Sequence, residues 1–94
     1  MEIRYHRDPE TGLPHIYDHG VTEREVEEVL GQVGEDYPAR RDSRLKMGKT
    51  AAGRYLQVFY VPDEVGVGLF VITAFDMTEK RKRAFRRRQR RRQR

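Results

Sequence analysis

Three strand-like runs separated by short polar connections lie between residue 43 and residue 75, and they restrict the fold more than any other feature. The runs span residues 43–48, 54–61 and 67–75. Strands joined by such short turns pair with one another as an antiparallel meander. The middle run is apolar at consecutive positions, as expected for a central strand that is covered on both faces. The sequence therefore predicts an antiparallel sheet with the middle run inside it.

The first of these runs alternates between apolar and basic side chains. Leu45 and Met47 share one parity, whereas Arg44 and Lys46 share the other. Because successive side chains of a strand point to opposite faces, we expect the two apolar residues to enter the core and the two basic ones to face solvent. Arg40 shares the parity of the basic pair. These cations could bind phosphate groups from one face of the sheet, although an ordinary solvent face carries the same pattern.

A helix over residues 23–33 is the clearest single element. Thr22 is followed three positions later by Glu25, which is the spacing of a capping box. The apolar stripe of this helix would consist of Val26, Val29, Leu30 and Val33. Residues at this spacing lie on one side of an α-helix, so the stripe is expected to pack on the sheet.

The N-terminal segment predicts a hairpin. Residues 2–7 alternate in polarity, and the turn-forming residues 8–12 end in Gly12. Glycine tolerates the positive φ that returns the chain. Residues 13–17 would then pair back as a short second strand, which Pro14 confines to a sheet edge.

The chain of 94 residues is long enough for one domain. The expected fold class is α+β, with a three- to four-stranded antiparallel sheet packed by the first helix and by a C-terminal helix. Asp76 and Glu79 repeat the capping spacing, so this second helix should begin near Met77. We expect residues 1–85 to form the domain. Residues 86–94 carry no apolar side chain and are expected to be a flexible or fraying Arg-rich extension.

The composition excludes several kinds of site. The chain has no cysteine, so it forms no disulfide and no thiolate metal site, which suits a reducing compartment. No apolar run approaches the length of a membrane span. The core of so small a domain leaves little room for a large cofactor. We therefore expect a soluble cytoplasmic protein that needs neither cofactor nor membrane.

The charge of the chain is divided between two regions. Residues 1–79 hold all 15 acidic residues and nine of the 20 Lys and Arg, a net charge of −6, whereas residues 80–94 hold the other eleven cations and no acid. Dense runs of Arg neutralise phosphates, so this segment predicts contact with RNA. The candidate RNA-binding residues are Arg40, Lys46, Lys80, Arg81, Arg83, Arg86, Arg87 and Arg88. The segment could instead be a solvated tail or fold against the acidic body.

The histidines allow two hypotheses. His15 and His19 would share a metal ion only on a helix, and Pro14 and Gly20 leave hardly one turn for it, so we expect no metal site. His19 directly precedes the first helix and could position RNA or move protons near neutral pH. A histidine bonded to a nearby carbonyl would look the same in the sequence. RNA cleavage through the 2′-hydroxyl needs a base, an acid and cations, and no spacing in the chain specifies that reaction.

Four short motifs follow one another along the chain. They are H-G-V-T-x-x-E-V at 19–26, R-x-x-x-G-K-T at 44–50, G-R-Y-L-x-V-x-Y at 53–60, and I-T-A at 72–74 leading into a basic helix. Over about residues 15–85 this order resembles the BrnT-like toxins, which are similar in fold to the RelE ribonucleases. The resemblance implies a type II toxin that cuts mRNA without metal and is silenced by a cognate antitoxin protein.

The resemblance also implies a set of catalytic residues. Carried over by position, they are His19, Arg44, Lys49, Arg54 and Tyr60. The family's last strand usually ends in an Arg, but here Phe75 and Asp76 follow Ala74, and Lys80 or Arg81 could supply the missing cation. The expected function is thus a metal-independent endoribonuclease toxin. The alternatives are a non-catalytic RNA-binding module or inactive relative, and an interaction protein whose basic tail binds an acidic partner.

Overall fold

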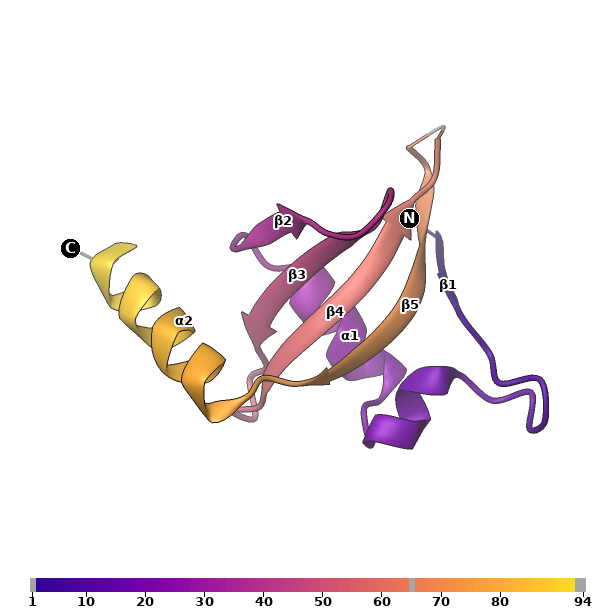
Figure 1. The fold of residues 1–94 in the computed structure, drawn as a ribbon, viewed down its shortest axis with the longest axis horizontal. Coiled ribbons are helices and arrows are strands. Elements are labelled where there is room, and N and C mark those ends of the chain that lie inside the picture. Colours follow the sequence, from indigo (N-terminus) through magenta and orange to yellow (C-terminus); the bar gives the residue numbers. More distant parts are fainter. Residues whose placement is uncertain (1, 65, 93–94) are drawn as a thin grey trace.

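The computed structural model describes residues 2–64 and 66–92 and has an α+β fold. Its elements along the chain are β1 (Glu2–Tyr5), the 3₁₀ helix η1 (His15–His19), α1 (Glu23–Leu30), β2 (Asp36–Pro38), β3 (Arg44–Lys49), β4 (Tyr55–Pro62), β5 (Gly68–Asp76) and α2 (Glu79–Arg92). The strands form one five-stranded sheet in the order β1-β5-β4-β3-β2 (Figure 1). The predicted α+β class is confirmed. The predicted sheet of three or four antiparallel strands is wrong, because the sheet has five strands and is mixed.

The mixed character of the sheet comes from β1. This strand pairs in parallel with β5, in a register that places Ile3 beside Leu69. The predicted return strand over 13–17 is wrong. Pairing there is limited to one bridge between Arg7 and Pro14, because proline has no N–H to extend a ladder. The chain instead turns into η1, which ends at Gly20 with φ of 67°.

The first helix begins as predicted and ends early. In the capping box, the Thr22 hydroxyl accepts from the Glu25 N–H and the Glu25 carboxylate accepts from the Thr22 N–H. The helix ends at Leu30 and not at residue 33. Val33 therefore lies beyond the apolar stripe and is fully exposed, while Val26 and Val29 are completely buried.

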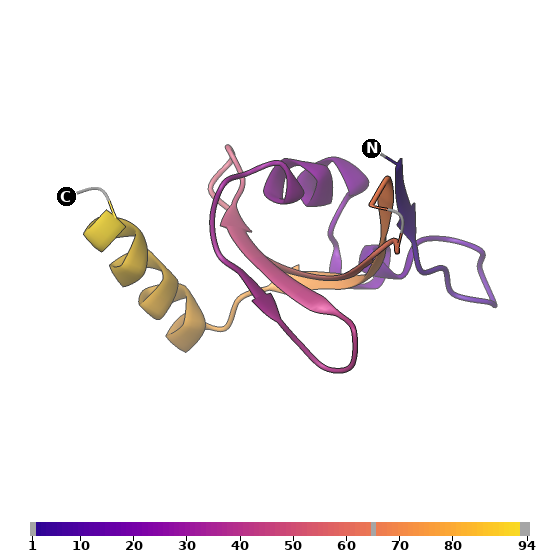
Figure 2. The ribbon, with the colours of Figure 1, turned by 90° about the horizontal axis from the view of Figure 1, so that it is seen from above.

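The main core lies between α1 and one face of the sheet. The sheet curves around α1, and among the described residues no helix covers the opposite face beyond the start of β4, where α2 contacts Tyr55 and Gln57 (Figures 1 and 2). The buried side chains on the covered face include Leu56, Val58, Val71 and Ala74. We call this the α1 face, and we call the opposite side of the sheet the open face.

The predicted orientation of β3 is reversed with respect to this core. Lys46 pairs with Val58 across the sheet, lies on the α1 face and is only 8% exposed. Its ammonium group donates to the main-chain carbonyl of Gln32, two residues beyond α1. The aliphatic part of its side chain packs among apolar groups. Leu45 and Met47 lie on the open face, in a smaller cluster with Phe85 of α2. Strand alternation separates two faces but does not say which one holds the larger core.

The second helix starts two residues later than predicted. Thr78, and not Asp76, caps α2, since its hydroxyl accepts from the Arg81 N–H. The Asp76 carboxylate is instead bound by Arg54. From Glu79 the helix continues to Arg92 and so includes most of the segment expected to fray; residues 93–94 of that segment lie outside the described residues. Figure 2 shows α2 standing beside the β3 side of the sheet.

Candidate nucleic-acid interface

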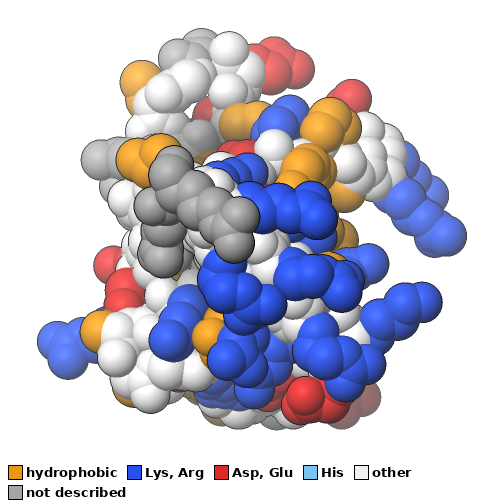
Figure 3. All heavy atoms as spheres, turned by 90° about the vertical axis from the view of Figure 1, so that its left-hand side faces the viewer, with side chains coloured by type: hydrophobic (Ala, Val, Ile, Leu, Met, Phe, Trp, Pro, Cys, Tyr) orange, Lys and Arg blue, Asp and Glu red, His pale blue; other side chains and the backbone are white. Residues whose placement is uncertain are grey.

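The surface of α2 is strongly cationic. Its 14 residues contain ten Lys and Arg and one Glu. Figure 3 shows Lys and Arg side chains gathered over this side of the molecule. Such a density of cations on one helix is the electrostatic pattern of a protein that binds a polyanion.

One of these cations anchors α2 to the sheet. Arg88 binds the carboxylate of Glu35 through its Nε and Nη2 atoms, at 2.9 and 2.7 Å. The side chain of Glu35 is fully buried and also accepts from the hydroxyl of Tyr37 at 2.7 Å. Burial alone would raise the pKa of Glu35, but the hydrogen bonds from Arg88 and Tyr37 outweigh it and lower that pKa. Arg88 thus serves the docking of α2, which limits its role as an RNA-binding residue.

Other cations of α2 remain free of acidic partners. Arg83, Arg86, Arg87 and Arg90 surround a hollow of about 240 Å³ on the helix surface. Among the residues that the structure describes, none of the four forms a salt bridge. We call this set the outer arginines. They are held at fixed spacing by the helix, and their charge is available to a ligand.

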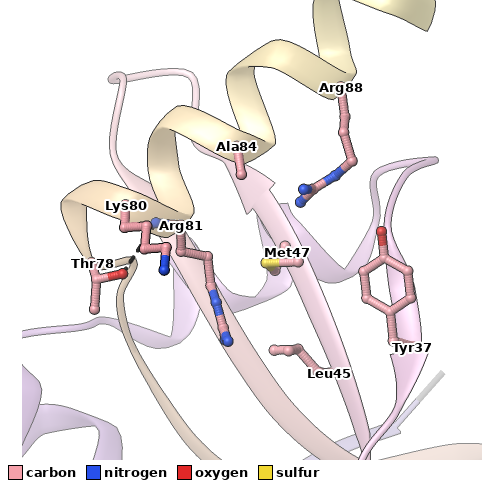
Figure 4. A pocket seen from close by; sticks show the side chains of 8 residues that line it. All are labelled: Tyr37, Leu45, Met47, Thr78, Lys80, Arg81, Ala84 and Arg88. Atoms are coloured by element: carbon pink, nitrogen blue, oxygen red, sulfur yellow. Dashed lines mark hydrogen bonds between the residues drawn. The ribbon is translucent and has the colours of Figure 1, made fainter.

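A groove separates α2 from the sheet (Figure 4). It has a volume of about 540 Å³ and is lined by Tyr37, Leu45, Met47, Thr78, Lys80, Arg81, Ala84 and Arg88. Arg81 and Arg88 point from the helix toward the strands (Figure 4). Arg81 donates to the side-chain carbonyl of Gln57 on the open face. The groove therefore combines an apolar floor with three cations on its helical wall.

The open face continues from this groove as a row of aromatic side chains. The rings of Phe59 and Phe75 lie 5.7 Å apart, and both side chains are partly exposed. Phe75 also pairs across the strands with Gln57. On the other side of Phe75, the ring of His19 packs edge-on at 5.6 Å. The open face thus presents a partly exposed aromatic surface with an imidazole at its edge.

A second hollow lies at the far end of the open face. It has a volume of about 690 Å³ and is lined by Arg40, Arg41, Asp42, Ser43, Val61 and Ile72. Arg40 and Arg41 are exposed and have no salt bridge among the described residues. Arg41 adopts a left-handed conformation with φ of 57°. Cations therefore stand at both ends of the aromatic surface.

The five residues predicted to be catalytic do not come together. Arg44 and Tyr60 face each other across β3 and β4 and both bind Asp36, at 2.8 Å from the Arg44 Nε. Burial and the hydrogen bond to Asp36 raise the pKa of Tyr60 to about 12. Lys49 lies at the opposite end of β3, roughly 16 Å away along the strand. Its ammonium group sits 5.4 Å from the centre of the Tyr55 ring.

Arg54 is enclosed by acidic and carbonyl groups. Its guanidinium group contacts both oxygens of Asp76 at 2.8 and 3.1 Å and the Glu25 carboxylate at 3.1 Å. It also donates to the carbonyls of Gly20 and His19. These bonds lower the pKa of Asp76. Arg54 therefore ties together η1, α1 and β5, and all of its donor groups are turned toward the protein.

The histidines gather near the turn after β1. His15 lies 5.3 Å from His19 and 5.8 Å from His6, measured between ring centres. The His15 Nδ1 atom is 3.0 Å from Asp8 and 3.4 Å from Asp18, and this contact lowers the pKa of Asp8. The donor atoms of His15 and the two aspartates lie within 4.8 Å of one another and could ligate a cation. His19, which the rejected metal hypothesis paired with His15, is not part of this set.

Several residues of the interface carry no recognisable signal in the sequence. Arg41, Gln57 and Phe59 gain their place from the strand register and from the loop before β3. Phe75 could have been noticed, since it stands where the resemblance expects an Arg.

The chain matches no protein-family model, no curated protein and no solved structure at a significant level. Among the described residues, no helix is both long enough and apolar enough to cross a membrane.

Proposed function

We propose that the protein binds RNA through α2 and the adjoining groove. The observation that carries this proposal is the set of outer arginines, which have no acidic partner among the described residues and belong to the helix that also forms one wall of the groove. Guanidinium groups bind phosphate oxygens in a bidentate manner. The resemblance to the BrnT-like toxins favours RNA over DNA as the polyanion. It is also the basis for proposing a RelE-like fold. The cysteine-free composition supports the proposal of a cytoplasmic location.

A salt titration tests this function. The double variant R83Q/R87Q removes two outer arginines, and R7Q/R24Q removes the same charge from exposed positions elsewhere. Each lost phosphate contact should reduce the salt slope for a single strand by about 0.7. Between 50 and 200 mM salt, the wild-type protein should therefore lose about sevenfold more affinity than R83Q/R87Q.

The control R7Q/R24Q should keep the wild-type slope. Equal slopes for all three proteins would contradict the proposal. Binding of polyglutamate and not RNA would favour the alternative of an interaction protein whose basic helix binds an acidic partner.

A second candidate function is RNA cleavage by a type II toxin, controlled by a cognate antitoxin protein. The observation that favours it is that His19 and Arg81 flank the same cross-strand pair, Phe75 and Gln57. Neutral His19 would take the proton from the 2′-hydroxyl, whose oxygen attacks the phosphorus. Arg81 and Lys80 would stabilise the charge on the phosphate. The 5′-oxygen leaves with a proton from water, and a 2′,3′-cyclic phosphate remains.

The cleavage proposal assigns different roles to the five predicted catalytic residues. His19 remains the candidate base, and Lys49 remains a candidate cation near α2. Arg44, Arg54 and Tyr60 stabilise the fold and do not contact the RNA, because their polar groups bind Asp36, Asp76 and Glu25. H19A should lower the cleavage rate by about a hundredfold or more, while H6A should not. Equal rates for the two variants would rule out His19 as the base, and no cleavage by the wild-type protein would leave RNA binding alone.

A further inference from the structure

We infer that the open face is a stacking platform for a short stretch of single-stranded RNA, with its phosphates held by cations at both ends. The inference rests on the proposed RNA binding and names the form of RNA that the interface takes. It is argued from the aromatic row and from the hollow at Arg40 and Arg41. Neither of these features was needed for the proposal that α2 binds RNA.

The aromatic row has the chemistry of a base-stacking surface. Phe59 and Phe75 present partly exposed rings 5.7 Å apart on neighbouring strands. In the part of the chain that the structure describes, no helix covers this face beyond the start of β4 (Figure 1). Ring faces bind any unpaired base, and each base so stacked adds appreciably to affinity. The bases of a duplex are stacked on one another and cannot use this surface.

The cations frame this aromatic row. Arg81 lies against Gln57 at one end, and the hollow of Arg40 and Arg41 reaches Val61 at the other. From Gln57 to Val61 the strand β4 advances about 13 Å. This length suits roughly four nucleotides, the lower end of the range for a single small domain. A strand lying along β4 would thus meet a cation at each end and rings between them.

The charges around the open face indicate which ligand binds there. An apolar peptide or a second copy of the chain would cover the rings but would place no anion beside Arg40, Arg41, Lys80 and Arg81. A single-stranded polyanion with flat apolar bases satisfies both kinds of group at once. The outer arginines contact phosphates of either form of RNA, since phosphate contacts do not depend on base pairing.

The test compares an eight-nucleotide oligoadenylate with a twelve-base-pair RNA duplex. F59L/F75L keeps apolar volume on the open face but removes both rings. It should bind the oligoadenylate about tenfold more weakly, and its affinity for the duplex should not change. F59Y/F75Y keeps the rings and should retain the wild-type affinity. R40Q/R41Q should weaken single-strand binding only, whereas R83Q/R87Q should weaken binding of both RNAs.

The outcomes separate the inference from the function on which it rests. If the wild-type protein binds neither RNA, RNA binding itself fails. If it binds both and F59L/F75L binds the oligoadenylate as tightly as the wild type, the platform is overturned while RNA binding stands. Dimerisation that F59L/F75L abolishes without a change in oligoadenylate affinity would assign the face to a second copy. Thermal unfolding checks that the variant is folded, and 2-aminopurine fluorescence in the bound strand reports stacking on the wild-type protein itself.

Discussion

Arg44 and Lys46 of β3, and Arg54 just before β4, bind acceptor groups of the protein itself, whereas along α2 most cations have no acidic partner among the described residues. Arg44 binds Asp36, Arg54 binds two carboxylates, and Lys46 donates to a carbonyl. On α2, Arg88 is paired with Glu35, but the outer arginines are not. Lys and Arg residues therefore have different roles in these two regions. A cation enclosed by acceptors stabilises the fold, and a cation left without acceptors is available to a ligand.

The largest expected effect is the loss of stability in R54M. The substitution leaves Glu25 and Asp76 without their cation and two carbonyls without a donor. We expect the free energy of unfolding to fall by about 3 kcal/mol, measured by urea denaturation. RNA affinity of the folded variant should stay at the wild-type value.

The matched control is R24M on the exposed side of α1, which should change stability by less than about 0.5 kcal/mol. A stable R54M that fails to bind or cut RNA would break the comparison, since it would place Arg54 among the cations that serve the ligand.

The next effect concerns how closely α1 packs on β3. A Cβ atom at Gly48 would lie 2.5 Å from the Gln32 side-chain oxygen and 3.0 Å from Val29. Gly48→Ala should therefore destabilise the fold by about 2 kcal/mol, seen as a lower thermal midpoint. Gly34→Ala is the control, because its new methyl group meets nothing closer than 4.0 Å. Equal thermal midpoints for the two variants would show that α1 can shift away from β3 at little cost in stability.

A smaller effect is expected where α2 is anchored. Glu35→Gln keeps the shape of the buried side chain and removes its charge, so the charge-assisted bonds from Arg88 weaken. The free energy of unfolding should fall by about 1–2 kcal/mol, and amide hydrogens of α2 should exchange faster. Glu10→Gln, in an exposed turn, should change neither the free energy of unfolding nor the amide exchange of α2. Unchanged exchange in α2 would mean that Phe85 alone holds the helix.

The smallest effect is a dependence on pH. Burial opposes ionisation of Glu35, but Arg88 and Tyr37 lower its pKa below the value of an unfolded chain, about 4.3. The stability that this depressed pKa contributes is therefore full above that value and is lost as the pH falls through the folded pKa. The stability gap between the wild type and Glu35→Gln should narrow between pH 5 and 3. A gap that stays constant over this range would contradict the assignment.

Elements that depend on neighbouring residues were predicted well from the sequence. Features that depend on contacts between distant parts of the chain were missed. The capping box of α1 and the three long strands depend on neighbours within a few residues, so spacing and alternation predict them. The three residues of β2 end in Pro38 and carry too little pattern to be recognised as a strand. The orientation of Lys46 could not be read from alternation, because both faces of the sheet bury apolar groups.

The candidate site was predicted in its charge and not in its geometry. The run of cations after Lys80 predicts a polyanion-binding surface, and the structure arranges it as a helix. The sequence could not show that Arg88 would meet a buried carboxylate, because Glu35 is 53 positions away. Nor could it show that Arg54 would be surrounded by acceptors. Contacts between residues far apart in the sequence decide whether a cation binds the protein itself or is available to a ligand.

The parallel pairing of β1 with β5 has a consequence for the order in which the molecule assembles. Each pair in this register joins residues 66 positions apart, whereas β3, β4 and β5 meet through short turns. Closing so long a loop costs more chain entropy than forming the turns. During synthesis, β1 leaves the ribosome first but must wait for the last strand to emerge. The sheet is therefore expected to grow from its centre, with the N-terminal strand as the final piece to join.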